Sequence, residues 1–157
     1  MKVAVSSDEH TPLVDFVLED LRRRGYEAVY YGPAAGEPDS GQNDWPLVTA
    51  KAVTLVAEGS ADQAIVMCWT GTGASLAANK VAGIRAALCH DAETAKGARV
   101  WNHANVLALS LRATPLPIAR EIMDAWFATP YSDDQWNLTQ MERIQALEAR
   151  FGTQPSS

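Results

Sequence analysis

The fold of this chain is decided by residues 65–75, which read Ile65-Val66-Met67-Cys68-Trp69-Thr70-Gly71-Thr72-Gly73-Ala74-Ser75. The apolar run before Cys68 is typical of an inner strand of a parallel sheet. Gly71 and Gly73 permit a tight turn, and the residues that follow favour a helix. Such a turn presents free backbone amides at a helix N-terminus, where they can hold an anion and favour the thiolate form of Cys68. We therefore place the chemistry in this segment.

Outside this stretch, strand and helix patterns alternate along the whole chain. We expect strands at 2–6, 28–31, 64–67, 84–89 and 106–109, and helices at 12–24, 46–58, 73–81, 92–101, 116–128 and 134–151. Five strands that alternate with helices predict an α/β fold with a parallel, doubly wound sheet covered on both faces. We assign residues 1–151 to a single domain and residues 152–157 to a disordered tail.

The bulk composition excludes several classes of protein. A net charge of −6 and a pI near 5.0 argue against a nucleic-acid partner. The longest apolar runs are too short to span a bilayer, so we expect no membrane partner. Two cysteines make no disulfide framework, which favours a reducing cytoplasm. The three histidines are scattered without zinc spacing, so we expect no metal site.

Ligands of doubly wound sheets bind beyond the carboxyl ends of the strands. These ends carry the Cys68 turn and the polar run Asp8-Glu9-His10, for which ligand contact is favoured over a solvated loop. Two readings stay open for Asn102, a turn-backbone role or a ligand contact, and two for Arg112, a surface cation or an anion anchor. Trp69 and Trp101 flank the polar loops and are expected to wall a pocket.

Almost the whole chain resembles the ribose-5-phosphate isomerase B / galactose-6-phosphate isomerase family, most densely from Cys68 to Arg112. The resemblance is densest in the runs 71–80 (GTGASLAANK), 83–91 (GIRAALCHD) and 105–109 (NVLAL), with Asp44-Trp45-Pro46 as a further matching segment. It implies a Rossmann-like, five-stranded three-layer fold and a homodimer or dimer of dimers with active sites shared between subunits. It also implies an aldose–ketose isomerisation through an enediolate without a cofactor.

The resemblance further implies roles for individual residues. Cys68 is the base that moves a proton between adjacent sugar carbons, Thr70 shuttles protons among the oxygens, and the amides around Gly71–Gly73 hold the enediolate oxygen. The substrate-contacting set expected from the motifs and the resemblance is Asp8, Glu9, His10, Trp69, Gly71, Thr72, Gly73, Ser75, Asn79, Trp101, Asn102 and Arg112.

This sequence departs from the family pattern within the site. Glu9 stands at the position of a family histidine, and Trp69 replaces a glycine. Trp101 aligns with the histidine that opens the sugar ring, and His103 is a displaced candidate for that catalytic acid. The phosphate-binding Arg-His and Arg of the C-terminal helix are replaced around residues 135–140, which leaves Arg112 as the clear anion anchor and Arg143 as a displaced substitute.

These departures predict that the substrate is not ribose 5-phosphate itself. A shorter or open-chain sugar phosphate does not need the ring-opening histidine, and an unphosphorylated sugar or sugar acid does not need the arginines. A second class of function stays open beside the isomerase, namely a module that binds or senses a sugar or small anion. Nucleotide binding is disfavoured, because the turn lacks both the dinucleotide fingerprint and the phosphate-loop lysine.

Overall fold

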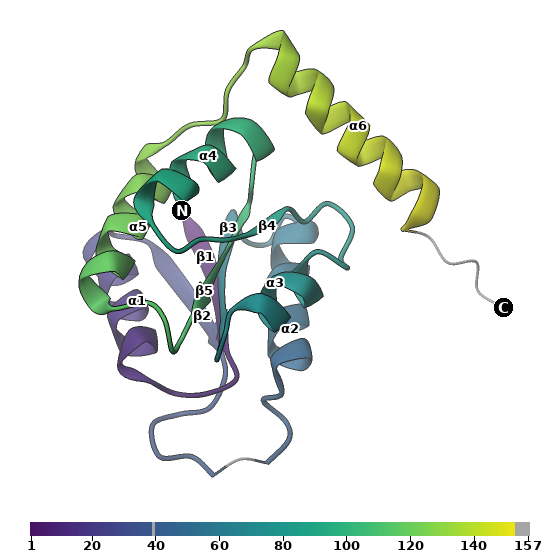
Figure 1. Cartoon of the computed structure of the whole chain (residues 1–157). Coiled ribbons are helices and arrows are strands. Elements are labelled where there is room, and N and C mark those ends of the chain that lie inside the picture. Colours follow the sequence, from purple (N-terminus) through teal and green to yellow (C-terminus); the bar gives the residue numbers. More distant parts are fainter. Residues whose placement is uncertain (39, 153–157) are drawn as a thin grey trace, which may run out of the picture.

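The computed structural model describes residues 1–38 and 40–152 (Figure 1). The strands are β1 (Lys2–Ser7), β2 (Glu27–Tyr31), β3 (Gln63–Cys68), β4 (Ala86–Leu88) and β5 (Val106–Ser110). The helices are α1 (Pro12–Arg23), α2 (Trp45–Ala57), α3 (Thr72–Ala78), α4 (Ala92–Asn102), α5 (Leu116–Ala128) and α6 (Gln135–Phe151). The sheet has the order β2-β1-β3-β5-β4, and every neighbouring pair is parallel. The expected α/β class and five-stranded parallel sheet are confirmed.

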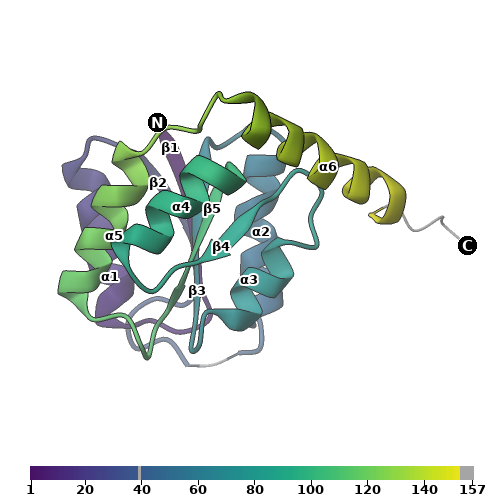
Figure 2. The same ribbon diagram turned by 45° about the horizontal axis from the view of Figure 1, so that its top comes forward.

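Helices cover both faces of the sheet (Figures 1 and 2). Large side chains fill the face under α1, α4 and α5, among them Ile65, Leu107 and Trp126. The face under α2 and α3 is built from smaller side chains such as Ala64 and Ala108, and it includes Cys68. The alternation of the two sets along each strand follows from the period of two in β-structure, which sends successive side chains to opposite faces.

Two elements are shorter than the sequence pattern predicts. Strand β4 covers three residues rather than 84–89, and α3 ends at Ala78 rather than near residue 81. Asn79, which follows α3, contacts the first residue of β4: its side-chain amide donates to the Ala86 carbonyl and accepts from the Ala86 amide, each at 2.9 Å. These two bonds occupy the outer edge of β4 and tie the end of α3 to it.

Helix α6 leaves the body of the molecule at the edge of the sheet where the strands begin (Figures 1 and 2). Among its residues only Asn137 is buried. A groove of about 920 Å³ lies between α6 and the β4 side of the body. Gly152 follows the helix, and its amide donates to the Glu148 carbonyl. The rest of the expected disordered tail, 153–157, lies outside the described residues.

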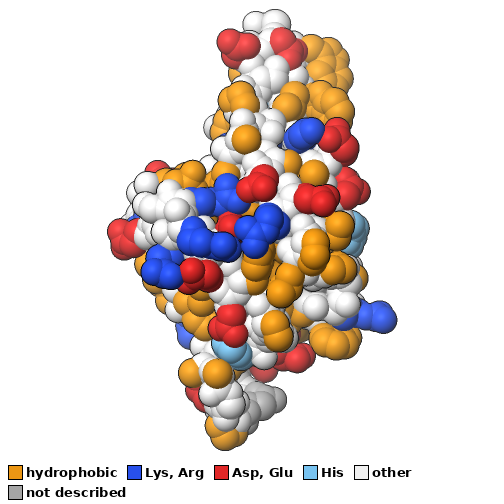
Figure 3. Space-filling model, turned by 90° about the vertical axis from the view of Figure 1, so that its left-hand side faces the viewer, with side chains coloured by type: hydrophobic (Ala, Val, Ile, Leu, Met, Phe, Trp, Pro, Cys, Tyr) orange, Lys and Arg blue, Asp and Glu red, His pale blue; other side chains and the backbone are white. Residues whose placement is uncertain are grey.

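The opposite flank of the molecule carries a cluster of cations over α1 and α5 (Figure 3). The nearly buried Asp20 carboxylate pairs with Arg23, Arg24 and Arg120, and Arg24 also pairs with Asp124. The cations of this cluster are therefore largely neutralised by partners within the chain. None of the helices in the described part of the chain is long and apolar enough to cross a membrane.

Candidate active site

Cys68 is the last residue of β3 and is almost fully buried. Its carbonyl oxygen accepts from the Gly71 amide at 3.1 Å and from the Leu111 amide at 3.0 Å. Its Sγ accepts from the Ala74 amide, in the first turn of α3, at 3.4 Å. The thiol is therefore held in one place by the backbone on both sides of it.

The turn after Cys68 requires glycine at position 71 and leaves little room for a side chain at position 73. Gly71 has a φ of +75°, and a Cβ there would lie 2.6 Å from the Leu88 side chain and 2.9 Å from the Leu109 backbone. A Cβ on Gly73 would lie 3.1 Å from the indole of Trp45, which covers the turn. The first helical turn thus fits closely between β5 on one side and the start of α2 on the other.

The free amides of this turn differ from those expected from the motif alone. The Gly71 amide is used by the Cys68 carbonyl, whereas the amides of Thr72 and Gly73 donate to no group among the described residues. The hydroxyls of Thr70 and Thr72 lie 2.6 Å apart and are exposed. Two unpaired amides and a hydroxyl pair beside a thiol can stabilise a developing oxyanion and move protons.

The loop after β5 lies against the same turn. The Trp69 carbonyl accepts from the Arg112 amide and from the Ser110 hydroxyl, both at 3.0 Å. The Trp69 indole is 53% exposed. The Arg112 side chain is also exposed and has no ion pair within the described residues. The Arg112 backbone is therefore bound to the Cys68 turn, and its guanidinium is unpaired among the described residues.

Asp8 lies on the other side of Cys68. Ser7 pairs with Met67 across β1 and β3, so Asp8 follows one residue later beside Cys68. Its Oδ1 is buried, with no hydrogen-bond partner within the described residues. Burial, and to a lesser degree the charge of Glu9, raises the pKa of the Asp8 carboxyl. His10 Nε2 lies 3.0 Å from Asp15 Oδ1, so this ring is held by α1.

Three residues expected in the site lie at the opposite edge of the sheet. Trp101 and Asn102 end α4, and His103 follows them before β5 begins. The four residue steps of β5 from Val106 to Ser110, beside Cys68, correspond to roughly 13 Å of strand. Residues that precede Val106 are therefore not brought to Cys68 within one chain.

His103 is tied into this opposite edge by several contacts. Its Nε2 lies 2.9 Å from the Ser132 carbonyl oxygen, which can only accept, so Nε2 carries the hydrogen. Its ring stacks on Tyr131 with centroids 4.6 Å apart, and its φ is +45° as the residue that ends α4. These contacts give His103 a structural task that the sequence did not indicate.

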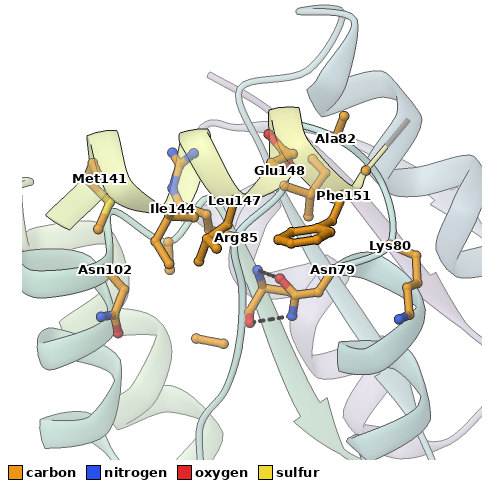
Figure 4. A pocket seen from close by; sticks show the side chains of 15 residues that line it. Asn79, Lys80, Ala82, Arg85, Asn102, Met141, Ile144, Leu147, Glu148 and Phe151 are labelled. Atoms are coloured by element: carbon orange, nitrogen blue, oxygen red, sulfur yellow. Dashed lines mark hydrogen bonds between the residues drawn. The ribbon is translucent and has the colours of Figure 1, made fainter. Parts of the chain in front are cut away.

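Asn79 and Asn102 line the groove under α6 rather than the Cys68 turn (Figure 4). Ser75 lies in α3, where its carbonyl accepts from the Asn79 side chain. Conversely, sequence reasoning left out Trp45 and Glu37, which line a cavity of about 530 Å³ next to Asp8. The sequence signal for Trp45 was the matching segment Asp44-Trp45-Pro46, and the signal for Glu37 was the long irregular segment before α2. The described residues contain no cluster of His, Cys, Asp and Glu able to hold a metal ion.

The chain is similar in sequence to known sugar-phosphate isomerases. Residues 3–147 match the family model described as Ribose/Galactose Isomerase. The chain is 36% identical to ribose-5-phosphate isomerase B of Escherichia coli, over 85% of this chain and 87% of that protein. It is 35% identical to D-erythrulose-4-phosphate isomerase 2 of Mycolicibacterium smegmatis, over 66% of this chain and 68% of that protein.

A solved structure extends the likeness to the fold. The type B ribose 5-phosphate isomerase of Trypanosoma brucei superimposes with a TM-score of 0.85 and 40% identity, covering 94% of this chain and 98% of that one. The sequence match, the shared fold and the strand–thiol–glycine turn all indicate the same family. The chain belongs to the ribose/galactose isomerase family of sugar-phosphate isomerases.

Proposed function

We propose that this protein is an aldose–ketose isomerase that acts on a small sugar phosphate through an enediolate, with Cys68 as the base. The observation that carries the proposal is the Cys68 thiol held at 3.4 Å by the Ala74 amide, beside the unpaired amides of Thr72 and Gly73. Family membership supports the reaction class. The two named relatives act on sugar phosphates of different length, which leaves the chain length of this substrate to experiment.

In the proposed reaction, the Cys68 thiolate removes the proton from the sugar carbon next to the carbonyl. The electron pair of that C–H bond forms the carbon–carbon double bond of the enediolate, and the carbonyl oxygen becomes the oxyanion. The Thr72 and Gly73 amides face this negative charge, and Thr70 moves a proton between the two oxygens. The thiol then returns its proton to the carbon that carried the original carbonyl group. The reaction therefore needs no external oxidant or reductant.

We also propose that the site is completed by a second copy of the chain. The groove-facing side of α6 carries exposed apolar side chains, with Leu147 54% and Phe151 62% exposed. Trp101, at the end of α4, is 59% exposed. A second copy would cover this apolar surface and bring Asn102 to a Cys68 turn. We do not assign the ring-opening acid to His103, because its ring is already bound to Ser132 and Tyr131.

The two free cysteines are consistent with action in a reducing compartment, and we propose the cytoplasm. The decisive test of the reaction is proton NMR in deuterated buffer with four- to six-carbon aldoses and ketoses, phosphorylated and unphosphorylated. We expect loss of a C1 or C2 proton signal from one substrate class. The Cys68→Ala variant is expected to slow this exchange by about 10²–10⁴-fold.

Cys89→Ala serves as the matched control, because the Cys89 thiol is buried under the sheet and burial raises its pKa to about 12. Full exchange by Cys68→Ala would refute the assigned base. No exchange with any sugar, together with thermal stabilisation by one of them, would instead favour the sugar-binding module.

A further inference from the structure

Cys68 ends β3, and the charged residues on the β1–β2 side of this strand differ in sign from those on its β5 side. On the β1–β2 side lies the cavity of about 530 Å³, which we call the acidic cavity. It is formed by the loop after β1, the loop after β2 and the start of α2, and its carboxyl groups belong to Asp8, Glu9, Glu37 and Asp44. None of the described residues that line it is Lys or Arg.

The charges of the acidic cavity are not neutralised from within. His10, the one lining residue that can be cationic, is held by Asp15 outside the lining. Glu37 accepts a hydrogen bond from the Ala34 amide at 2.7 Å, which fixes its carboxylate without cancelling its charge. The pKa of the neighbouring Tyr30 is raised to about 12 by burial and by the charges of Asp15, Asp8 and Glu37. The cavity is therefore a region of negative potential.

The acidic cavity adjoins the proposed catalytic turn. Asp8 follows β1 beside Cys68, and the Trp45 indole that lines the cavity also packs against Gly73. Carboxylates accept hydrogen bonds from hydroxyls, and an indole face packs against C–H groups. A substrate whose reacting carbons reach Cys68 would therefore extend its hydroxylated chain into this cavity.

The other side of Cys68 has the opposite charge. The strand order β2-β1-β3-β5-β4 places β3 between the acidic cavity and the loop after β5. That loop carries Arg112, whose guanidinium has no ion pair within the described residues. A molecule bound across Cys68 thus meets carboxylates at one end and a cation at the other.

We propose that Glu9 and Glu37 are specificity-determining residues that exclude a phosphate group from the acidic cavity. The cavity receives the uncharged, hydroxylated end of the substrate, and a phosphate group is directed to the Arg112 side. This inference rests on the proposed isomerase function.

The test is an NMR titration of the protein with inorganic phosphate at low and at high salt. The double variant Glu9→Gln, Glu37→Gln keeps the shapes of both side chains and removes two negative charges. We expect it to bind phosphate about tenfold more tightly than the wild type at low salt, with the difference shrinking in about 0.5 M salt. Glu58→Gln is the matched control, since Glu58 lies exposed at the far end of α2 and its loss should leave phosphate affinity unchanged.

Equal phosphate affinity in the wild type and the double variant would overturn the proposal, and so would an equal gain in Glu58→Gln. Glu37→Gln alone is the second variant, expected to give about a threefold gain. Proton exchange on sugars, measured on the same samples, separates this proposal from the isomerase function. If the wild type shows no proton exchange, the proposed reaction is refuted. The phosphate titration still tests whether the carboxylates of the acidic cavity weaken phosphate binding. An active enzyme whose variants do not gain phosphate affinity refutes the cavity proposal alone.

Discussion

At the edge of the sheet where the strands end, the Cys68 turn is held by backbone bonds from α3 and from the loop after β5, whereas at the edge where the strands begin α6 leans over an open groove. The first region brings Cys68, the Thr70 and Thr72 hydroxyls and the unpaired amides together within one chain. The second region exposes apolar side chains and the expected site residue Asn102, and no other segment among residues 1–38 and 40–152 covers them. The difference is what we expect if one chain builds the proposed proton-transfer part of the site and a second copy completes it, as proposed above.

The largest effect is expected from disturbing the edge of the sheet where the strands end, which we call the preformed edge. Gly71→Ala places a methyl group 2.6 Å from Leu88 in a left-handed backbone conformation, so we expect a loss of about 3 kcal/mol in the free energy of unfolding. Gly25→Ala is the control, because Gly25 has the same φ of +75° but nothing within 4 Å of its Cβ. It should cost about 1 kcal/mol. Urea unfolding of both variants measures the difference, and equal losses would show that the turn is not tightly packed.

The edge of the sheet where the strands begin, which we call the open edge, is the proposed contact surface for a second copy. We test this contact by adding a charge to α6. Leu147→Glu places a carboxylate in the groove under α6 (Figure 4), where we expect it to weaken association between two copies by about 30-fold. Gln145→Glu adds the same charge outside the lining of the groove and should leave association unchanged. Analytical ultracentrifugation measures both. A wild type that stays monomeric at high concentration would contradict the proposed completion of the site by a second copy.

Asn79 sharpens the comparison, because it serves the open edge as a structural clamp. Asn79→Ala removes both hydrogen bonds to the Ala86 backbone and should cost about 1–2 kcal/mol of stability. The neighbouring Lys80→Ala, at an exposed side chain with no hydrogen bond or ion pair to the described residues, should change stability by less than about 0.5 kcal/mol. Thermal unfolding that is the same for both variants would show that the clamp contributes nothing.

The smallest expected effect concerns Asp8 and the pH. Burial raises the pKa of its carboxyl in the folded state, so the folded protein favours the protonated form. Its ionisation therefore lowers stability as the pH rises through the folded-state pKa, and no such loss exists below the unfolded-state pKa of about 3.9. Asp8→Asn is expected to raise Tm by roughly 1–2 °C at pH 7 and not at pH 3, while slowing proton exchange.

Asp133→Asn, at an exposed position, is the control for the Asp8 variant and should not change Tm at either pH. A lower Tm of Asp8→Asn at pH 7 would show that the ionised carboxylate stabilises the loop. That outcome would also weaken the view that the preformed edge trades stability for function.

Local pattern was sufficient for much of the fold. The β-branched run before Cys68, the two glycines after it and the repeated change between periods of 2 and 3.6 predict a parallel sheet with helices on both faces. These features are readable because each depends on neighbours within a few residues. The Cys68 turn was accessible for the same reason, since the thiol, the threonines and the glycines that form it lie within six residues of sequence.

Contacts between distant residues were decided only by the tertiary structure. The strand order sets Asp8 beside Cys68 and places Trp45 over Gly73, and no spacing in the chain encodes that order. The start of β5 puts Asn102 and His103 at the edge opposite Cys68, although all three were expected in one site. A strand carries the chain from one edge of the sheet to the opposite edge. Residues just before β5 therefore lie far from Cys68, although the residues just after β5 lie beside it.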